Sequence, residues 1–204
     1  MITGILSLMS SAPVASLDDV ADDVLAARAT AGDREALEAL LRRHAADVYK
    51  LCHLVAGETD APDAAQRTLE KLVLHIDRFE PEKGSFRTWA LTVARNVCRD
   101  RLRRRKLERA TFNRDGEERV QREPDEQPSP ERLALARIDA GHVAKALETL
   151  PEGMRSAIVL FHVHGASYEE IAETLAIPKG TVMTWLHRGR ARLRAALEPG
   201  EVGA

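Results

Sequence analysis

Aromatic residues, cysteines and strand-like runs are all scarce in this chain of 204 residues. Only 4% of the residues are Phe, Trp or Tyr, and no stretch alternates apolar with polar residues as a half-exposed strand would. The apolar residues recur instead at helical spacing, so the sequence predicts an all-α fold of one or two small domains. The short apolar run at the N-terminus lacks preceding basic residues and is too short to cross a bilayer. We therefore expect neither membrane insertion nor a signal peptide.

The scarcity of cysteine also argues against a disulfide framework and against the common zinc sites. Cys52 and Cys98 both fall within helical patterns, so we expect two buried thiols in a reducing cytoplasm. The seven histidines show no spacing typical of metal ligands, and we expect no metal and no cofactor. An enzyme would need converging carboxylates, a nucleophile or a triad. Paired acids such as Asp60 and Asp63 are better explained as helix-start residues, so we do not expect an enzyme.

The net charge is only −2, but the charges are segregated along the chain. Seven cations fall within residues 95–106, against the single acid Asp100: Arg95, Arg99, Arg101, Arg103, Arg104, Arg105 and Lys106. Positive charge near a helix C-terminus is favoured by the helix dipole, which explains part of this run. So many cations in a short stretch repel one another, however. A polyanionic partner that releases counterions on binding explains the run better.

Residues 167–197 carry the most specific local pattern. Ser167 and Glu170 have the spacing of a capping box, and a second helix is predicted from Lys179 after a break at residues 176–178. The second helix is predicted to bury one stripe, made of Val182, Leu186, Gly189, Leu193 and Leu197. It contains no acidic residue. An ordinary helical hairpin with a solvated basic face is the alternative, but the pattern favours a helix-turn-helix whose second helix enters the DNA major groove.

The remaining sequence predicts a first helical unit and a linker. Helical spacing indicates a short and a long helix from Val24, a third helix capped by Asp60, and a fourth from Ser85 to about Lys106. The third helix is predicted to bury Ala65, Leu69, Leu72, Val73 and Ile76. We predict a flexible tail over 1–23, a first domain over 24–106, a linker over 107–129, a second domain over 130–198 and a tail over 199–204. The linker follows from its mixed charges, its prolines and its few apolar residues.

Two basic helical modules joined by such a linker resemble the extracytoplasmic-function (ECF) sigma factors of the sigma-70 superfamily. The resemblance rests on four stretches that follow the family's order: GDREALEALLRRHAADVYKLC, DAPDAAQRTLEKLVLHIDRF, FRTWALTVARNVCRDRLRRRK and LPEGMRSAIVLFHVHGASYEEIAETLAIPKGTVMTWLHRGRARLR. It implies a four-helix region 2 and a helix-turn-helix region 4 that bind bacterial core RNA polymerase and promoter DNA. It also implies a cytoplasmic, nucleoid-associated protein that an anti-sigma factor masks, often at the membrane.

The resemblance further implies three sets of binding residues. Docking on the polymerase would fall on the third helix, at Asp63, Gln66, Arg67, Thr68, Leu69 and Glu70. Recognition and opening of the −10 element would fall on the loop before Ser85 and on Trp89, Asn96, Arg99 and Arg103. Recognition of the −35 element would fall on Lys179, Thr181, Thr184, Trp185, Arg188 and Arg192.

Alternatives remain for some of these residues. A tryptophan beside a buried stripe is more often part of the core than a platform on which a base stacks. For Trp89 we therefore favour a core role over stacking on DNA. Trp185 stands where the family often has a cation, and it offers an apolar contact to DNA instead. Ala176 occupies a turn position where glycine is common, so this turn must avoid positive φ or carry strain. A stand-alone helix-turn-helix regulator would explain the C-terminal half, but it leaves the basic helix of the first domain unexplained.

Overall fold

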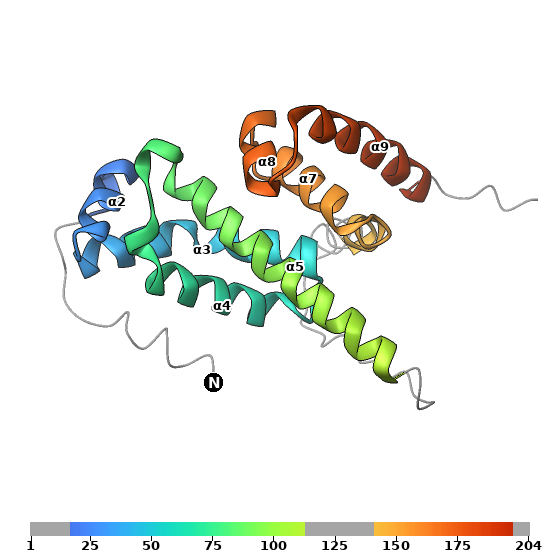
Figure 1. The fold of residues 1–204 in the computed structure, drawn as a ribbon, viewed down its shortest axis with the longest axis horizontal. Helices are drawn as coiled ribbons and strands as arrows, with labels where there is room; N and C mark the ends of the chain where they lie inside the picture. Colours follow the sequence, from blue (N-terminus) through green and yellow to red (C-terminus); the bar gives the residue numbers. More distant parts are fainter. Residues whose placement is uncertain (1–16, 113–140, 198–204) are drawn as a thin grey trace, which may run out of the picture.

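The computed structural model describes residues 17–112 and 141–197, and every regular element in these two ranges is helical (Figure 1). The first range contains η2 (Leu17–Asp19), α2 (Asp22–Thr30), α3 (Arg34–Ala56), α4 (Ala61–Leu74), η3 (Ile76–Arg78), η4 (Pro81–Lys83) and α5 (Phe86–Phe112). The second contains a helical segment over 141–148, then α7 (Glu152–His162), α8 (Tyr168–Leu175) and α9 (Lys179–Leu197). The all-α prediction is confirmed.

Some of the predicted segments lie outside the described residues. These are residues 1–16 of the tail predicted over 1–23, the linker from 113 onward, the start of the second domain up to 140, and the chain after 197. Within 17–23, the structure has η2 and the start of α2 in place of a tail. The first part of the predicted linker is helical instead, because α5 continues to Phe112 rather than ending near Lys106. In the described ranges, no helix combines the length and the apolar content that crossing a membrane requires.

Local sequence signals set several helix boundaries. Asp33 accepts hydrogen bonds from two backbone N–H groups in the first turn of α3, at 3.0 and 3.1 Å. Ser85 Oγ accepts one from the backbone N–H of Thr88 at the start of α5, at 3.1 Å. The two side chains thus provide acceptors for backbone N–H groups that have no partner within the first turn of a helix. Asp60 precedes α4, but its side chain makes no capping hydrogen bond, so that prediction is wrong.

The N-terminal module is a bundle in which α3 packs against α2, α4 and α5 (Figure 1). Its largest fully buried side chains are Leu25, Leu40, Leu51, Val48, Val55, Leu72 and Phe86. Cys52 and Cys98 are free, buried thiols in this core, as predicted. Hydrogen bonding to Cys52, together with burial, raises the pKa of Cys98 far above the usual range. Val73 was predicted to be buried beside Leu72, but it is 47% exposed because it points about 100° further round the helix.

The C-terminal module is built from the 141–148 segment, α7, α8 and α9, with α7 in contact with both other helices. Ile158, Leu160 and Ile171 are buried in it, together with Val182 and Leu186 from the predicted stripe of α9. Gly189 lies in the same stripe, and a Cβ atom there would come within 2.9 Å of Ile158 Cγ1. The stripe ends early, since Leu197 is 43% exposed.

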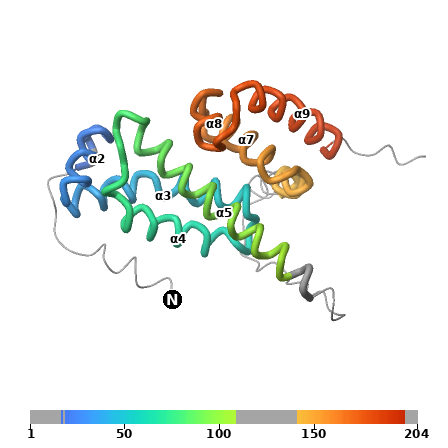
Figure 2. Tube along the Cα trace, in the orientation of Figure 1, coloured from blue at the N-terminus to red at the C-terminus, as the bar shows by residue number. Residues whose placement is uncertain are grey.

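The two modules pack against each other along one side of the N-terminal bundle (Figure 2). In this contact α7 lies against α3, and α8 lies against α5. Arg155 of α7 donates a hydrogen bond from Nη1 to the backbone oxygen of Val55, near the end of α3, at 2.7 Å. Arg95 of α5 places its Nε 3.4 Å from Oε1 of Glu152 at the start of α7. Two buried cations, one from each module, therefore connect the modules.

His164, in the turn after α7, is buried at the same contact. Its Nδ1 lies 3.8 Å from Oδ1 of Asp47 on α3, and neither ring nitrogen has a hydrogen-bond partner. Burial lowers the pKa of His164 to about 4; the Asp47 carboxylate opposes this shift, while the cations Arg87 and Lys50 add to it. The imidazole is thus held neutral, because a charge at this place would lose its hydration without gaining a hydrogen bond.

We expect the contact between the modules to loosen as the pH falls. The pKa of His164 is about 4 in the packed state and near its ordinary value of 6.5 once the side chain is exposed. Its contribution is therefore complete above about pH 6.5 and is lost as the pH falls toward the lower value. Small-angle X-ray scattering should give a larger radius of gyration at about pH 5 than at about pH 7.5. His164→Leu, which stays neutral, should reduce this difference, and an unchanged expansion would assign it to other groups.

Candidate nucleic-acid interface

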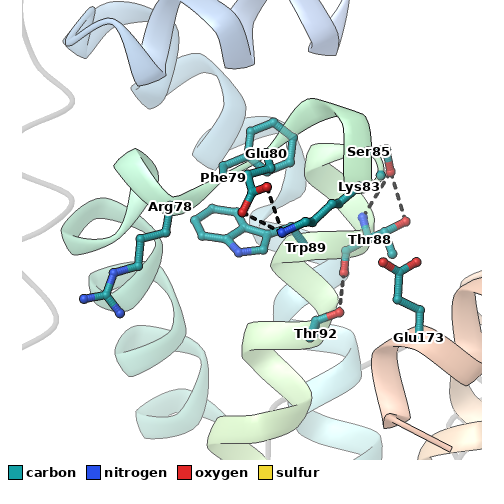
Figure 3. A pocket seen from close by; sticks show the side chains of 10 residues that line it. Arg78, Phe79, Glu80, Lys83, Ser85, Thr88, Trp89, Thr92 and Glu173 are labelled. Carbon is teal, nitrogen blue, oxygen red and sulfur yellow. Dashed lines mark hydrogen bonds and ion pairs between the residues drawn. The ribbon is translucent and has the colours of Figure 1, made fainter.

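A hollow of about 170 Å³ opens where the chain enters α5 (Figure 3). Its walls come from residues 78–80 and 83–85 of the loop before α5, from Thr88, Trp89 and Thr92 on α5, and from Glu173 on α8. An ion pair between Lys83 and Glu80, 2.7 Å long, braces the loop. Gly84 ends the loop at φ 148°, a backbone conformation that glycine adopts more readily than other residues. The loop and the start of the helix thus form one site.

Trp89 belongs both to the core and to this hollow. Its ring centroid lies 5.5 Å from that of Phe79 and 5.6 Å from that of Phe86, within the distances of favourable aromatic pairs. The side chain is only partly buried, and it forms part of the wall of the hollow. The core role expected for Trp89 is present, and the ring is also within reach of a ligand in the hollow.

The polar residues of α5 continue from the hollow along one flank of the helix. Thr88, Thr92, Asn96, Arg99 and Arg103 recur at helical spacing along this flank. Asn96 is half-buried, and its Oδ1 accepts a hydrogen bond from Arg95 Nη1 at 3.2 Å. Arg99 and Arg103 are exposed. The structure therefore places all four residues predicted for the −10 element along or beside one flank.

Part of the basic run on α5 is used inside the protein. Arg101 and Arg105 both bind the carboxylate of Asp60, at 3.0 Å each, and Arg101 also pairs with Asp63. Asp60 is 6% exposed, and such a buried carboxylate needs compensating charge. Arg95 is buried as well. The interpretation that the whole basic run binds a polyanion is therefore too broad. The exposed cations of the run that take no part in these contacts are Arg99, Arg103, Arg104 and Lys106.

The residues predicted to contact a polymerase do not all reach the surface of α4. Gln66, Arg67 and Glu70 are exposed, while Asp63 and Leu69 are partly buried. Thr68 is fully buried, and its hydroxyl donates to the backbone oxygen of Ala64 at 2.7 Å. The prediction that Thr68 contacts the polymerase is therefore wrong. Its side chain faces the bundle, and its hydroxyl already has a hydrogen-bond partner within the same helix.

The predicted helix-turn-helix is present in the C-terminal module. Ser167 and Glu170 form the capping box: Glu170 N–H donates to Ser167 Oγ at 3.2 Å, and Ser167 N–H donates to Glu170 Oε2 at 2.8 Å. The second helix starts at Lys179 as predicted. Between the two helices, Ala176 has φ 53° and ψ 49°. This left-handed conformation is strained for alanine. Of the two outcomes expected for this turn, avoidance of positive φ or strain, the structure shows strain.

Most of the residues predicted for the −35 element lie on accessible parts of α9. Lys179, Thr184, Arg188 and Arg192 are exposed, and Thr181 is half-buried. Lys179 is paired with Glu169 at the start of α8.

Trp185 differs from the other residues of this set because its ring packs on α7. A Cβ atom added to Gly153 would lie 2.5 Å from Trp185 Cζ3, so the ring occupies the space that any other residue would need. The side chain is partly buried against the core. The ring therefore fixes how α9 sits on α7. Sequence reasoning missed this role because the glycine that allows it lies in another helix.

Two family models match the chain, described as Sigma-70 region 2 over residues 40–108 and Sigma-70, region 4 over residues 142–193. The RNA polymerase sigma factor CnrH of Cupriavidus metallidurans is 31% identical over 87% of this chain and 95% of CnrH. The ECF RNA polymerase sigma factor SigW of Bacillus subtilis is 30% identical over 81% of this chain and 91% of SigW. The chain belongs to the ECF sigma factors of the sigma-70 family. The family predicted from the sequence is therefore confirmed.

Other relatives agree with this assignment. The ECF sigma factor SigE of Mycolicibacterium smegmatis is 35% identical over 80% of this chain, which spans 63% of the length of SigE. The structure of CnrH in complex with the cytosolic domain of CnrY aligns with a TM-score of 0.64 and 28% identity, over 86% of this chain and 96% of that one. The structure of sigma factor RpoE of Bartonella quintana in complex with the anti-sigma factor NepR aligns with a TM-score of 0.61 and 26% identity, over 78% of this chain and 95% of that one.

Sigma factors direct promoter recognition and the initiation of transcription by RNA polymerase, and they are not catalysts. Among the residues that the structure describes, no group of three or more His, Cys, Asp or Glu side chains could hold a metal ion. The groups that line the candidate site are hydroxyls, an amide, an indole ring and guanidinium groups, which interact through hydrogen bonds, stacking and charge.

Replacing Ala176 by glycine should stabilise this ECF sigma factor. Ala176→Gly removes the left-handed strain, offset in part by the greater freedom of glycine in the unfolded chain, and should raise the free energy of unfolding by about 0.5–1 kcal/mol. The matched control is Ala191→Gly on the exposed, helical part of α9, which should lose about 1 kcal/mol. Urea unfolding of the three proteins measures both changes, and a loss in both variants would contradict the strain at Ala176.

Replacing Gly153 by alanine should force Trp185 away from α7. We expect a loss of about 1–3 kcal/mol in the free energy of unfolding, the range for overpacked positions. Gly141→Ala is the control, because nothing lies within 4 Å of a Cβ atom there. In a Trp185→Leu background, Gly153→Ala should cost much less, since the two sites are coupled. Equal costs in both backgrounds would show that the ring does not set the requirement for glycine.

Proposed function

We propose that the N-terminal module captures an unstacked base of the −10 element in the hollow beside Trp89, while α9 reads the −35 element and α4 docks on core RNA polymerase. The observation that carries this proposal is the continuity of the hollow with the flank that leads to Arg99 and Arg103. A stand-alone regulator would use only the C-terminal module. It gives no role to a hollow and a basic flank on the other module.

Base capture explains the chemistry of the hollow. Opening a duplex costs a few kcal/mol per base that leaves the stack, and a protein recovers this by stacking and by hydrogen bonds to the freed base. The hollow, at about 170 Å³, is smaller than the roughly 300–1,000 Å³ of small-molecule sites. It combines an aromatic wall, Trp89, with the hydroxyls of Thr88 and Thr92. One base fits this chemistry better than a larger ligand.

The residues beyond the hollow supply complementary contacts. The side-chain amide of Asn96 can bond to a base edge, and Arg95 already orients its oxygen. Arg99 and Arg103 are exposed cations that suit the phosphates of a strand running along the helix. Base contacts and backbone contacts thus lie in sequence along α5.

The C-terminal module supplies direct readout through fewer side chains than the sequence indicated. Thr184 and Arg188 are exposed on α9, and arginine reads guanine through two hydrogen bonds in the major groove. The ring of Trp185 packs on α7. We therefore propose that it orients α9, and we do not assign it a contact with a base. Thr181 and the N-terminal end of α9 suit a phosphate.

The docking surface of α4 is a polar network. Arg67 Nε lies 3.1 Å from Asp63 Oδ2, and Gln66 Nε2 donates to Glu70 Oε1 at 3.0 Å. We assign these four residues and Leu69 to the contact with the polymerase, without Thr68. We also propose a cytoplasmic location, where core polymerase acts, and regulation by an anti-sigma factor that can itself be tied to the membrane.

The test of this function is reconstituted transcription with the full chain, bacterial core RNA polymerase and fragmented genomic DNA. Discrete new start sites that require the chain, together with co-elution of the chain with core polymerase, are the expected result. DNA binding without association with polymerase and without new starts would reject the proposal.

Two substitutions should separate the roles of the two modules at such a start site. Asn96→Ala should lower strand opening by about tenfold, the loss of one base contact worth 1–3 kcal/mol, with less effect on closed-complex binding. Arg188→Ala should instead weaken binding at the −35 element by a similar factor. Permanganate footprinting measures opening, and gel shift measures binding. Arg194→Ala, which removes the same charge from the last turn of α9, is the control for Arg188. Normal opening in Asn96→Ala would contradict its assignment.

A further inference from the structure

We infer that His44 on α3 is a positioning residue for the hollow beside Trp89, and that Asp22 on α2 holds the His44 ring in place. This inference rests on the proposed function, because it concerns the aromatic wall against which a captured base would stack. His44 does not line the hollow and acts through the ring of Phe86. The start of α2, which was predicted to belong to a flexible tail, thereby receives a role in the DNA site.

The His44 side chain is buried and is held at one end by α2. His44 is 7% exposed, and its Nε2 lies 2.7 Å from Oδ2 of Asp22. A carboxylate only accepts hydrogen bonds, so Nε2 carries the hydrogen that is donated. The other oxygen of Asp22 pairs with Arg43, whose guanidinium also donates to the backbone oxygen of Leu17 at 3.2 Å. Asp22 thus binds two consecutive residues of α3, which fixes the direction in which the His44 ring points.

The His44 ring is the first of a series of aromatic rings that ends at the hollow. Its centroid lies 5.5 Å from that of Phe86. The Phe86 centroid in turn lies 5.8 Å from that of Phe79 and 5.6 Å from that of Trp89. The rings of Phe79 and Trp89 also lie together, 5.5 Å apart, beside the loop that precedes α5 (Figure 3). All these distances fall within the range at which aromatic rings attract one another.

The cluster of rings is enclosed on the side away from the hollow. Phe79 and Phe86 are 7% and 2% exposed, and α2 packs against both the loop and the start of α5 (Figure 1). Core side chains pack at nearly crystalline density, and neighbours relax in part into any space that a lost side chain leaves. Removal of the His44 ring therefore displaces Phe86. Trp89 rests on Phe86 and is only partly buried, so its position changes as well.

Packing alone does not explain a histidine at this place. Phenylalanine or leucine would fill the same space without a buried polar atom that needs a partner. The hydrogen bond from His44 to Asp22 satisfies that atom and also selects one orientation of the ring, as buried polar groups do when their partners are complete. Aromatic pairs attract only in particular geometries, so a wall on which a base stacks must keep one orientation. The pair of His44 and Asp22 meets this requirement.

The first experiment measures the packing of Trp89 in the full chain without DNA. The chain has two tryptophans, so Trp185→Phe leaves Trp89 as the only source of tryptophan bands in near-ultraviolet circular dichroism. These bands require side chains in fixed packing, and they disappear when the packing is lost while the helices remain. In this background, His44→Ala and Asp22→Ala should each weaken the bands and leave the far-ultraviolet spectrum unchanged.

Asp23→Ala is the matched control, because it removes the same charge from the same turn of α2. Asp23 is exposed, and its Oδ1 accepts from the backbone N–H of Val24 at 2.9 Å. The bands should keep their intensity in this variant. Adding Asp22→Ala to His44→Ala should weaken them no further, since the two residues act as one unit. Full bands in Asp22→Ala, or an equal loss in Asp23→Ala, would overturn the inference. This comparison holds even if His44→Ala does not fold, because the Asp22 side chain is 32% exposed.

The second experiment measures strand opening at a start site that the unmodified chain directs with core polymerase. His44→Ala and Asp22→Ala should each lower permanganate reactivity about two- to tenfold, the fold-change that corresponds to one lost aromatic contact. Asp23→Ala should open the site as the unmodified chain does. Gel-shift binding at the −35 element should not change in any of the three, because α9 belongs to the other module.

The outcomes separate this inference from the proposed function. If the unmodified chain directs no start site with any fragment, the proposed function is rejected, while weakened bands in His44→Ala and Asp22→Ala still support the positioning of Trp89. If start sites appear and both variants open them normally, the proposed function stands and the inference is overturned.

Discussion

A buried guanidinium fixes the relation between the two modules. Arg155 donates to the backbone oxygens of Val55, Glu148 and Leu150, at 2.7, 2.8 and 3.2 Å. Carbonyls at helix C-termini lack partners within their own helix and carry partial negative charge. A cation at this junction therefore provides hydrogen bonds to carbonyls at the ends of two helices together. Burial lowers the pKa of Arg155, and acids nearby oppose that effect. A charge held in this way is costly to leave unpaired, and the position of α7 on α3 depends on it.

What the sequence predicted well was local. The start of α5 at Ser85 and the capping box at Ser167 depend on side chains that bond within three residues of their own position, and the start of α9 at Lys179 was predicted from the local break before it. The apolar stripes depend on the helical period alone. The candidate flank of α5 could be drawn for the same reason, since residues at helical spacing share a face wherever the helix lies.

What the sequence could not predict depends on contacts between distant segments. Asp60 was interpreted as a cap, but it binds Arg101 and Arg105, about forty positions away, and the supply of free cations on α5 is smaller as a result. Trp185 was assigned to DNA because its own helix gave no other role, and Gly153, which receives its ring, lies two helices earlier. No pattern within a single helix could reveal that α8 covers Thr88 and Thr92.

Glu170 does two things with one carboxylate. Oε2 accepts from the backbone of Ser167 and so helps to start α8, while Oε1 accepts from Thr88 on the other module. During evolution the two sides of this contact are therefore not equally free to change. A substitution at Glu170 loosens the start of a helix of only eight residues, whereas a substitution at Thr88 removes the contact and leaves α8 intact. Descendants of this chain can adjust how firmly its modules associate most readily through α5.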